Sequence, residues 1–444
     1  MTHTILVEGT AQGAIGYQVA FGDGAELAFN ADDAHAQVPH QYTVSGSYQV
    51  SVAVSRQGVF AAANGPVFVL DPPPLAMSIS ASRPGGYVPF EVLFRVRRTD
   101  GTASGPVSYR IDFDGDGAFD AAVTTEAPEH VFSHEYSALG AVTVLSCITQ
   151  ESAEACASAT ITAEAVPPVG QRAFHDRPDD DAGLQMHAVY VSCTDCPDNG
   201  LDVDGTLANS VGSFQNWFAL RTGLVLREDL YGGERDIGYF RMPMTMAEIA
   251  AWGALVVSVI YDSLHAAGFS DPDKKYLIYY SGYSNHACGG ALIDGPASAM
   301  YLGGWQGRSV CGGTLFATSP LSAPEYWEFA ALHDFVHTLG YVDFHAPNHD
   351  PRSPAHTTDS CRDLMGGGNG PNGNSIGWCP DEVDVRNDDY FGDALGESVR
   401  NLKVDPWLKS VAASEMAIIR ARAERRLRLF EPFVHDLIHT PSAK

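Results

Sequence analysis

Two histidines stand four residues apart inside a segment, Pro324 to Gly340, that has the composition of a helix. Proline suits the first turn of a helix, and glycine suits the left-handed position after the last turn. His333 and His337 would then project from one face of that helix, about one turn apart. Two neutral imidazoles at this spacing can bind one Zn²⁺ ion. The pair therefore predicts half of a zinc site.

The residue after the first histidine bears on what such a site can do. In the H-E-x-x-H pattern of zinc peptidases, a glutamate acts as general base on water that the metal activates. This chain has Asp334 at that position, and the aspartate side chain is shorter by one C–C bond, about 1.5 Å. Displacing a catalytic group by ~1 Å can cost ~10²-fold in rate. Two hypotheses stay open: Asp334 is the base of an active peptidase, or the chain keeps zinc and has lost most turnover.

Further metal-binding residue types follow the helix. His356 is our first choice for the third zinc ligand, Asp343 the second and His349 the third, whereas His345 is interpreted as a solvated loop residue. Histidine is a sparse residue, so packing alone is a poor explanation for this density. Met365 would pack beneath the metal as a soft apolar floor. The segment as a whole favours a metal site over a structural cluster.

The stretch from His333 to Gly340, together with Asp363-Leu-Met365, resembles bacterial secreted zinc metallopeptidase-like proteins related to the metzincins. Other stretches echo the same group: Leu201-Asp-Val-Asp-Gly, Ala287-Cys-Gly-Gly-Ala and Asn387-Asp-Asp-Tyr-Phe. The resemblance spans about residues 185–410 and implies an α/β zincin-like domain, which we assign to residues 170–444. We expect Leu402 to Lys409 and the Arg-rich stretch from Ala412 to Phe430 to close this domain as helix. The resemblance also implies a long zinc helix that ends at glycine, with a Met turn beneath the metal. Metzincin spacing would place the third ligand at Asp343, whereas within the closer resemblance His356 is the steadier feature.

The first part of the chain repeats one pattern twice. Alternating apolar and polar residues, as in Ser47 to Ser55, predict strands, and Gly-Asp turns separate them. Phe21-Gly-Asp-Gly with His40-Gln-Tyr42 recurs as Phe113-Asp-Gly-Asp-Gly with His134-Glu-Tyr136. Both halves resemble polycystic-kidney-disease-type (PKD) domains, which are small immunoglobulin-like β-sandwiches. We therefore predict one all-β sandwich over residues 1–70 and a second over 71–166, as a module for an extracellular matrix or cell-surface ligand.

The second sandwich carries a turn with carboxylates at alternate positions, from Asp112 to Asp120. Oxygen ligands at that spacing suit Ca²⁺. Aspartate and glycine are also ordinary turn residues. A structural calcium ion and a hydrated hairpin turn remain equal alternatives.

Composition limits the classes of function. The chain has 444 residues, enough for about three domains, and its formal net charge is −27. So acidic a surface repels phosphate backbones, which argues against nucleic acid as a partner. The longest apolar stretches are shorter than the ~20 residues that a membrane helix needs, so we expect no membrane span.

The eight cysteines fall into sequence-local pairs, which favour disulfides in an oxidising compartment over a structural zinc site. The first residues show no signal peptide, yet the cysteines favour a secreted, extracellular protein. These observations together predict a secreted zinc-dependent endopeptidase that acts on a protein or peptide. The alternative is a catalytically impaired zincin-like protein that serves extracellular binding or adhesion.

Overall fold

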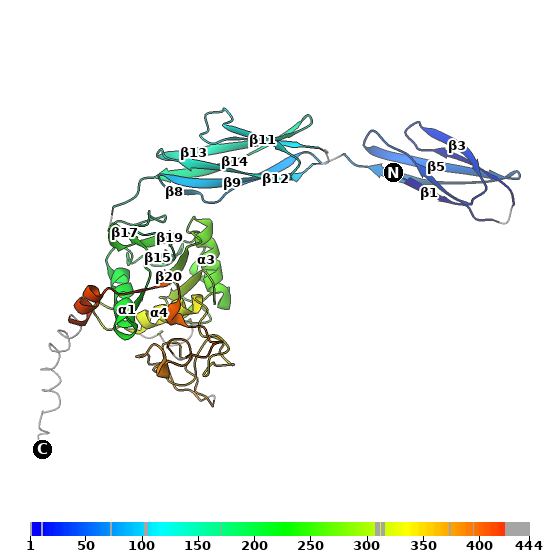
Figure 1. Cartoon of the computed structure of the whole chain (residues 1–444). Helices are drawn as coiled ribbons and strands as arrows, with labels where there is room; N and C mark the ends of the chain where they lie inside the picture. Colours follow the sequence, from blue (N-terminus) through cyan, green and yellow to red (C-terminus); the bar gives the residue numbers. More distant parts are fainter. Residues whose placement is uncertain are drawn as a thin grey trace, which may run out of the picture.

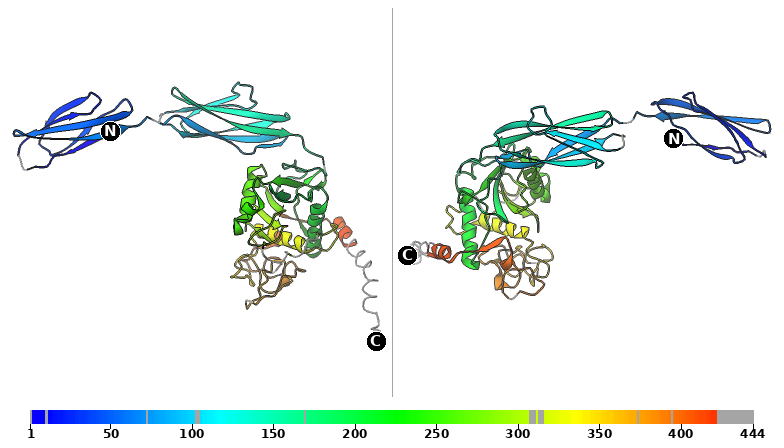
Figure 2. Two further views of the ribbon diagram at one scale, coloured as in Figure 1. Left: turned by 180° about the vertical axis from the view of Figure 1, so that it is seen from behind. Right: turned by 45° about the horizontal axis from the view of Figure 1, so that its top comes forward.

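The computed structural model describes residues 2–9, 12–71, 73–101, 105–168, 170–306, 311, 316–372, 374–393 and 395–421 of the chain. Figure 1 shows two β-rich bodies in line, followed by a third body that contains the helices. The same arrangement is visible from behind and from above in Figure 2. The protein is thus a β-rich chain of several bodies.

The first body packs a four-stranded sheet against a pair of strands. The sheet has the order β3-β2-β5-β6, and β1 pairs with β4. The bounds are β1 Thr2–Leu6, β2 Ile15–Ala20, β3 Glu26–Ala31, β4 His35–Pro39, β5 Gly46–Arg56 and β6 Val59–Val69. Alternate residues of β2, namely Ile15, Tyr17 and Val19, are at most 1% exposed. The period of two in the sequence therefore builds one buried face.

The second body is a fuller sandwich. One sheet has the order β11-β10-β13-β14-β8 and the other β12-β9-β7. The bounds are β7 Ala76–Ala81, β8 Gly85–Tyr87, β9 Phe90–Asp100, β10 Val107–Asp112, β11 Ala121–Thr125, β12 Glu129–Tyr136, β13 Gly140–Gln150 and β14 Ala153–Glu164. Strand β9 buries Phe90, Val92, Phe94 and Val96 and exposes the residues between them. Its pattern is that of a strand with one face in the core.

The sequence repeat corresponds to a repeated contact. In the second body the His134 ring stacks on Phe113 at 4.5 Å between centroids, and the Tyr136 hydroxyl donates to the Phe113 carbonyl at 3.0 Å. In the first body the matching stack measures 3.9 Å and the matching hydrogen bond 3.1 Å. The residues there are Phe21, His40 and Tyr42. Each body thus ties its Gly-Asp turn to a later segment with the same three side-chain types; this segment is strand β12 in the second body and follows β4 in the first.

The third body is built on a five-stranded sheet of order β19-β15-β20-β22-β21. Strands β15 Gln185–Ser192, β19 Ile237–Arg241, β20 Lys274–Tyr280 and β22 Ala297–Tyr301 are parallel, and β21 Gly289–Ala291 is antiparallel to β22. Two small pairs join β16 Leu224–Leu226 to β23 Leu408–Ser410 and β17 Leu230–Tyr231 to β18 Glu234–Arg235. All eight residues of β15 are buried, as expected for a parallel strand covered on both faces.

Helices cover both faces of this sheet. Helices α1 Thr206–Thr222 and α4 Tyr326–Thr338 pack on the face that carries Tyr190 and Leu277. Helices α2 Met246–Ala250 and α3 Val256–Ala266 pack on the face that carries Val189 and Ile278. Three 3₁₀ turns complete the elements: η1 Gly253–Leu255, η2 Val385–Asn387 and η3 Leu402–Val404. Residues 170–421 therefore form a three-layer α/β body (Figure 1), in which α4 contacts β21 and β22 at the antiparallel edge of the sheet.

One prediction near the end of this body is wrong. We expected Leu402 to Lys409 to be helical, but η3 is a single turn and β23 follows it. Pro406 lacks an N–H group and disfavours the helical conformation at Asp405, which explains the break. Of the expected closing helix from Ala412 to Phe430, residues 413–421 are helical. The remainder lies outside the described residues.

All eight cysteines form disulfides in the pairs that their spacing suggested. The bonds are Cys147–Cys156, Cys193–Cys196, Cys288–Cys311 and Cys361–Cys379. Four disulfides fit an extracellular, oxidising environment. Within the described part of the chain, no helix is both long enough and apolar enough to span a bilayer.

Candidate metal centre

Helix α4 presents the two motif histidines. The Glu325 N–H donates to the Glu328 carboxylate at 2.9 Å, which satisfies a free donor at the start of the helix. Gly340, directly after the C-cap residue, has a φ of 83°. Its N–H donates to the carbonyl of His337 at 2.9 Å. The predicted left-handed glycine therefore lies where the chain leaves the helix.

Three imidazoles converge beside α4. The Nε2 atom of His333 lies 3.0 Å from Nε2 of His337 and 3.2 Å from Nε2 of His356. His356 comes from the loop segment after α4, in which the described residues form only isolated bridges and short turns. The structure thus brings together the three residues that the sequence analysis ranked first.

Each imidazole is oriented by a bond on its other nitrogen. His333 Nδ1 donates to the Leu364 carbonyl at 2.7 Å, and His337 Nδ1 donates to the Tyr341 carbonyl at 3.0 Å. His356 Nδ1 lies 3.1 Å from the Pro354 carbonyl. A carbonyl can only accept, so it fixes the proton on Nδ1 and leaves the lone pair on Nε2. All three lone pairs therefore point into one space.

Burial keeps these rings neutral. It lowers the pKa of His333 to about 3, with a further contribution from His356. Burial also lowers the pKa of His337 well below its usual value, and it lowers that of His356. Neutral imidazole is the form that binds metals. The electrostatics of the cluster therefore match its geometry.

The three residues fit a zinc ion. Four ligands in tetrahedral geometry at Zn–N distances of about 2.0–2.1 Å lie about 3.3 Å from one another. The separations of 3.0 and 3.2 Å are close to that value. Hydrogen-bonded neutral rings have no other reason to direct three acceptor nitrogens at one point. His333, His337 and His356 could hold Zn²⁺ and leave its fourth position open.

The other ligand candidates lie elsewhere. The Asp343 carboxylate accepts from the backbone N–H groups of His345 and Arg400, at 2.7 and 2.6 Å. His345 is exposed and lies 3.3 Å from that carboxylate. His349 lines a hollow of about 460 Å³, and its backbone bridges to Thr357, the residue after His356. None of these three residues belongs to the cluster of converging imidazoles.

Met365 lies in the core beneath this region and is fully buried. Its carbonyl accepts the N–H of Thr357, the residue after His356, at 3.0 Å. Trp378 was missed in the sequence: its Nε1 donates to the Leu364 carbonyl at 3.1 Å, the same carbonyl that His333 uses. The Met turn therefore connects the loop histidine to the helix histidine.

Asp334 lies on the side of α4 that faces the antiparallel edge of the sheet. Its Oδ2 occupies the space that a Cβ atom on Gly289 would need. Burial raises the pKa of Asp334 to about 8. Its charge in turn raises the pKa values of the Tyr301 and Tyr326 hydroxyls, whose own burial contributes more. The sequence analysis did not assign a role to Gly289, although the quoted Ala287-Cys-Gly-Gly-Ala stretch contains it.

In the turn of the second sandwich where calcium was predicted, backbone N–H groups donate to the carboxylates. Asp112 accepts from the N–H groups of Gly115 and Gly117, and Asp120 accepts from that of Phe113. The oxygens of Asp112, Asp114 and Asp120 lie within 4.8 Å of one another. Backbone donors account for this turn, and calcium there stays a prediction.

A buried charge cluster also escaped the sequence analysis. Lys274 Nζ donates to Asp176, Asp179 and Asp229 at 2.7, 2.6 and 2.7 Å, and Asp229 also contacts His187 Nδ1 at 2.5 Å. The ammonium group already occupies the centre of these carboxylates. The cluster is therefore compensated internally and ties β15 and β20 to the segment before β15.

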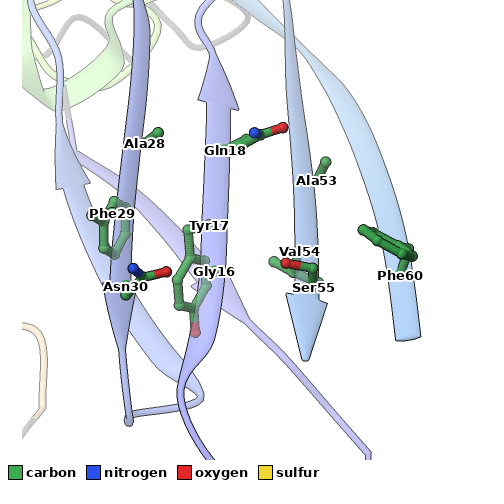
Figure 3. Close-up of a pocket in the computed structure, with 10 residues that line it drawn as sticks. All are labelled: Gly16, Tyr17, Gln18, Ala28, Phe29, Asn30, Ala53, Val54, Ser55 and Phe60. Atoms are coloured by element: carbon green, nitrogen blue, oxygen red, sulfur yellow. The ribbon is translucent and has the colours of Figure 1, made fainter. Parts of the chain in front are cut away.

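A hollow of about 320 Å³ lies on the β3-β2-β5-β6 sheet (Figure 3). Phe60 at its rim is 79% exposed, and Tyr17 stacks on Phe29 beneath it. Amide and hydroxyl groups come from Gln18, Asn30 and Ser55. None of the described residues that line it is a histidine, a cysteine or a carboxylate.

Comparisons with known proteins concern the β-sandwich bodies. No family model matches the sequence, and no curated protein matches it. Among solved structures, the PKD domain of an M14-like peptidase from Thermoplasmatales archaeon SCGC AB-540-F20 is 18% identical, covering 21% of this chain and 99% of that one, at a TM-score of 0.17. The PKD domain of the human VPS10 domain-containing receptor SorCS2 is 25% identical, covering 22% of this chain and 77% of that one, also at 0.17.

The fibronectin(III)-like modules of Clostridium thermocellum CbhA are 16% identical, covering 37% of this chain and 86% of theirs, at a TM-score of 0.17. These neighbours are β-sandwich modules of the PKD and fibronectin types, and the likeness is partial. None of the three is a metallopeptidase domain. The zincin-like character of residues 170–444 therefore stays a prediction.

Proposed function

We propose that this protein is a secreted zinc-dependent hydrolase of peptide bonds. The observation that carries the proposal is the convergence of the Nε2 atoms of three neutral imidazoles. Nε2 of His333 lies 3.0 Å from that of His337 and 3.2 Å from that of His356. In this proposal residues 170–444 form a zincin-like catalytic domain. Residues 1–70 and 71–166 form PKD-like sandwiches that bind an extracellular protein or surface.

When bound, zinc would supply a Lewis acid and an activated water at its open position. The chain's own residues supply the rest. Asp334, one residue after His333, is the acid–base group, which accepts a proton from water and passes it to the leaving amine. Burial raises the pKa of Asp334 to about 8, so its carboxylate form is a stronger base than that of an ordinary aspartate.

The substrate would lie along the antiparallel edge of the sheet. Strand β21, Gly289–Ala291, is the last strand in the sheet order, and among the described residues no further strand pairs with it. An open strand edge can hydrogen-bond an extended peptide. Gly289 also contacts the Asp334 carboxylate, so a peptide on this edge would pass close to the acid–base group.

The test is hydrolysis of an unfolded protein substrate by the full chain, with its metal content measured by mass spectrometry. We expect about one zinc per chain, activity that a chelator removes and zinc restores, and loss of about 10²-fold or more in Asp334→Asn. Zinc should remain in that variant. Zinc-loaded protein without any hydrolysis would refute the proposal.

An extracellular binding protein with an inactive zincin-like domain is the second candidate. One observation favours it: the first sandwich has a hollow with the exposed ring of Phe60 at its rim. Asp334→Glu separates the two candidates. Raised activity would indicate a weakened enzyme, whereas zinc-loaded but inactive protein in both forms would favour binding.

A further inference from the structure

The loop segment that carries His356 is rich in buried aspartates. Four of them are at most 3% exposed, and each carboxylate accepts two or more hydrogen bonds. They are Asp350, Asp363, Asp384 and Asp389. Asp350 accepts from Arg352 and Asn369, and Asp363 accepts from the Tyr390 hydroxyl and the Met365 and Val385 amides. Asp384 accepts from the amides of residues 389–391, and Asp389 accepts from Asn348.

Asp359 is different from these four. Both of its carboxylate oxygens are sealed from solvent, each with less than 1 Å² of accessible surface, and in the described part of the chain no group other than its own backbone N–H is a hydrogen-bond partner. Asp388 Oδ1 is sealed and unpartnered in the same way. Three carboxylate oxygens therefore lack the compensation that buried charge requires.

Asn348 brings these two aspartates into one neighbourhood. The N–H and the hydroxyl of Thr358 donate to the Asn348 carbonyl at 3.0 and 3.2 Å. The N–H and the side-chain amide of Asn348 donate in turn to Asp389, at 2.7 and 3.0 Å. Asp359 follows Thr358 in the chain, and Asp388 precedes Asp389, so the unpartnered carboxylates lie on the two segments that Asn348 joins.

The electrostatics agree with this placement. Burial raises the pKa of Asp359 to about 6, and the charges of Asp389 and Asp388 raise it further. Arg386 opposes them, but its side chain is exposed. A bound cation would remove the repulsion and supply the missing partner.

We propose that Asp359, Asp388 and Asp389 form a calcium site. Carboxylate oxygens without nitrogen or sulfur donors select a hard cation. Three carboxylates from two segments do not impose the regular octahedron that Mg²⁺ demands, whereas Ca²⁺ accepts irregular geometry. Asp389 still has free lone pairs, because each oxygen accepts only one of the two Asn348 bonds.

The site would fasten the segment around residue 359 to the segment around residue 388. His356 lies three residues before Asp359, so the ion would also restrain the loop that supplies the third imidazole. The calcium site does not rest on zinc binding, because it shares no residue with the histidine cluster.

The experiment is calorimetric titration of Ca²⁺ into the full, disulfide-bonded chain at about pH 7, after removal of bound metal on a chelating resin. Four proteins are compared: the unmodified chain, Asp359→Asn, Asp112→Asn and Glu397→Gln. Asp112→Asn controls for the turn in the second sandwich. Glu397→Gln removes one exposed charge from the same loop region.

We expect Asp359→Asn to weaken Ca²⁺ binding at one site by ~10-fold or more, while both control variants keep that site. Asp388→Asn should act like Asp359→Asn and provides the test if the latter does not fold. Unchanged titration in Asp359→Asn and Asp388→Asn would overturn the proposal, as would a chain whose Ca²⁺ binding is wholly lost in Asp112→Asn. His333→Ala should lose zinc and keep this calcium site, which separates failure of the zinc proposal from failure of this one.

Discussion

The Asp334 carboxylate packs against Gly289, so that the acid–base candidate on α4 touches the edge strand of the sheet. The contact requires a residue without a side chain, because a Cβ atom on Gly289 would also lie 3.1 Å from the Ala299 carbonyl oxygen and from Met300 Cε. The helix that carries His333 and His337 therefore also contacts the strand edge at one point, through Asp334 and Gly289.

Replacement of Gly289 by alanine should displace Asp334 and lower peptide hydrolysis. A shift of ~1 Å in a catalytic group costs up to ~10²-fold, and the measurement is kcat/KM with zinc content determined in parallel. Gly290→Ala is the matched control, because a Cβ atom there meets only the Tyr301 hydroxyl, at 3.3 Å. Equal activity in the two variants would contradict a role for the contact.

Removal of an imidazole should remove zinc. His333→Ala and His356→Ala each leave two ligands, so we expect the zinc affinity to fall by 10²-fold or more, an order-of-magnitude expectation for losing one of three protein ligands. Competition with a chromogenic chelator measures it. His345→Ala is the control, since this exposed ring contacts Asp343 and lies outside the cluster. Normal affinity in His356→Ala would exclude it as the third ligand.

The Tyr136 hydrogen bond should stabilise the second sandwich. Its hydroxyl is buried and donates to the Phe113 carbonyl, so Tyr136→Phe leaves a buried acceptor unpaired and should cost about 1–3 kcal/mol in the free energy of unfolding. Denaturant unfolding of the full chain measures the change. Tyr48→Phe, whose exposed hydroxyl donates to Val44, should cost less than about 0.5 kcal/mol. Similar losses of unfolding free energy in both variants would show that the buried hydrogen bond contributes no more to stability than the exposed one.

The free energy of unfolding of the calcium-free chain should fall as the pH rises from about 4 to about 6. The pKa of Asp359 is raised to about 6 in the folded protein, so the folded state binds its proton more tightly than the unfolded state, whose pKa is about 3.9. This stabilisation is complete below the lower pKa and is lost as the pH rises through the higher one. Denaturant midpoints across this range should show a smaller decline in Asp359→Asn. An identical pH profile in both proteins would contradict the assignment.

Local patterns predicted the features that depend on neighbouring residues. The α4 helix, its glycine terminus and the four cysteine pairs are all visible in short windows, and so is the Phe–His–Tyr repeat of the sandwiches. The Asp204-Gly205 turn leads directly into α1, and Asp204 accepts the N–H of Thr206. These features follow from spacing, capping and backbone conformation, which a sequence displays directly.

Contacts between distant segments could not be predicted in the same way. Spacing alone did not separate His356 from Asp343, because their positions depend on how a long loop folds back; the family resemblance ranked His356 first, and Asp343 binds the amide of Arg400. The packing of Asp334 on Gly289 and the Lys274 cluster likewise join elements far apart in the chain. No periodicity encodes such pairs, because they arise from the order of strands in the sheet.

The three imidazoles come from supports of unequal rigidity. His333 and His337 are carried by a regular helix, whereas His356 lies in a segment with only isolated bridges among its described residues. A metal ion that binds all three imidazoles would therefore restrict the backbone freedom of the loop. Part of the coordination free energy would be consumed by that entropy loss, so the measured dissociation constant would understate the strength of the bonds to nitrogen.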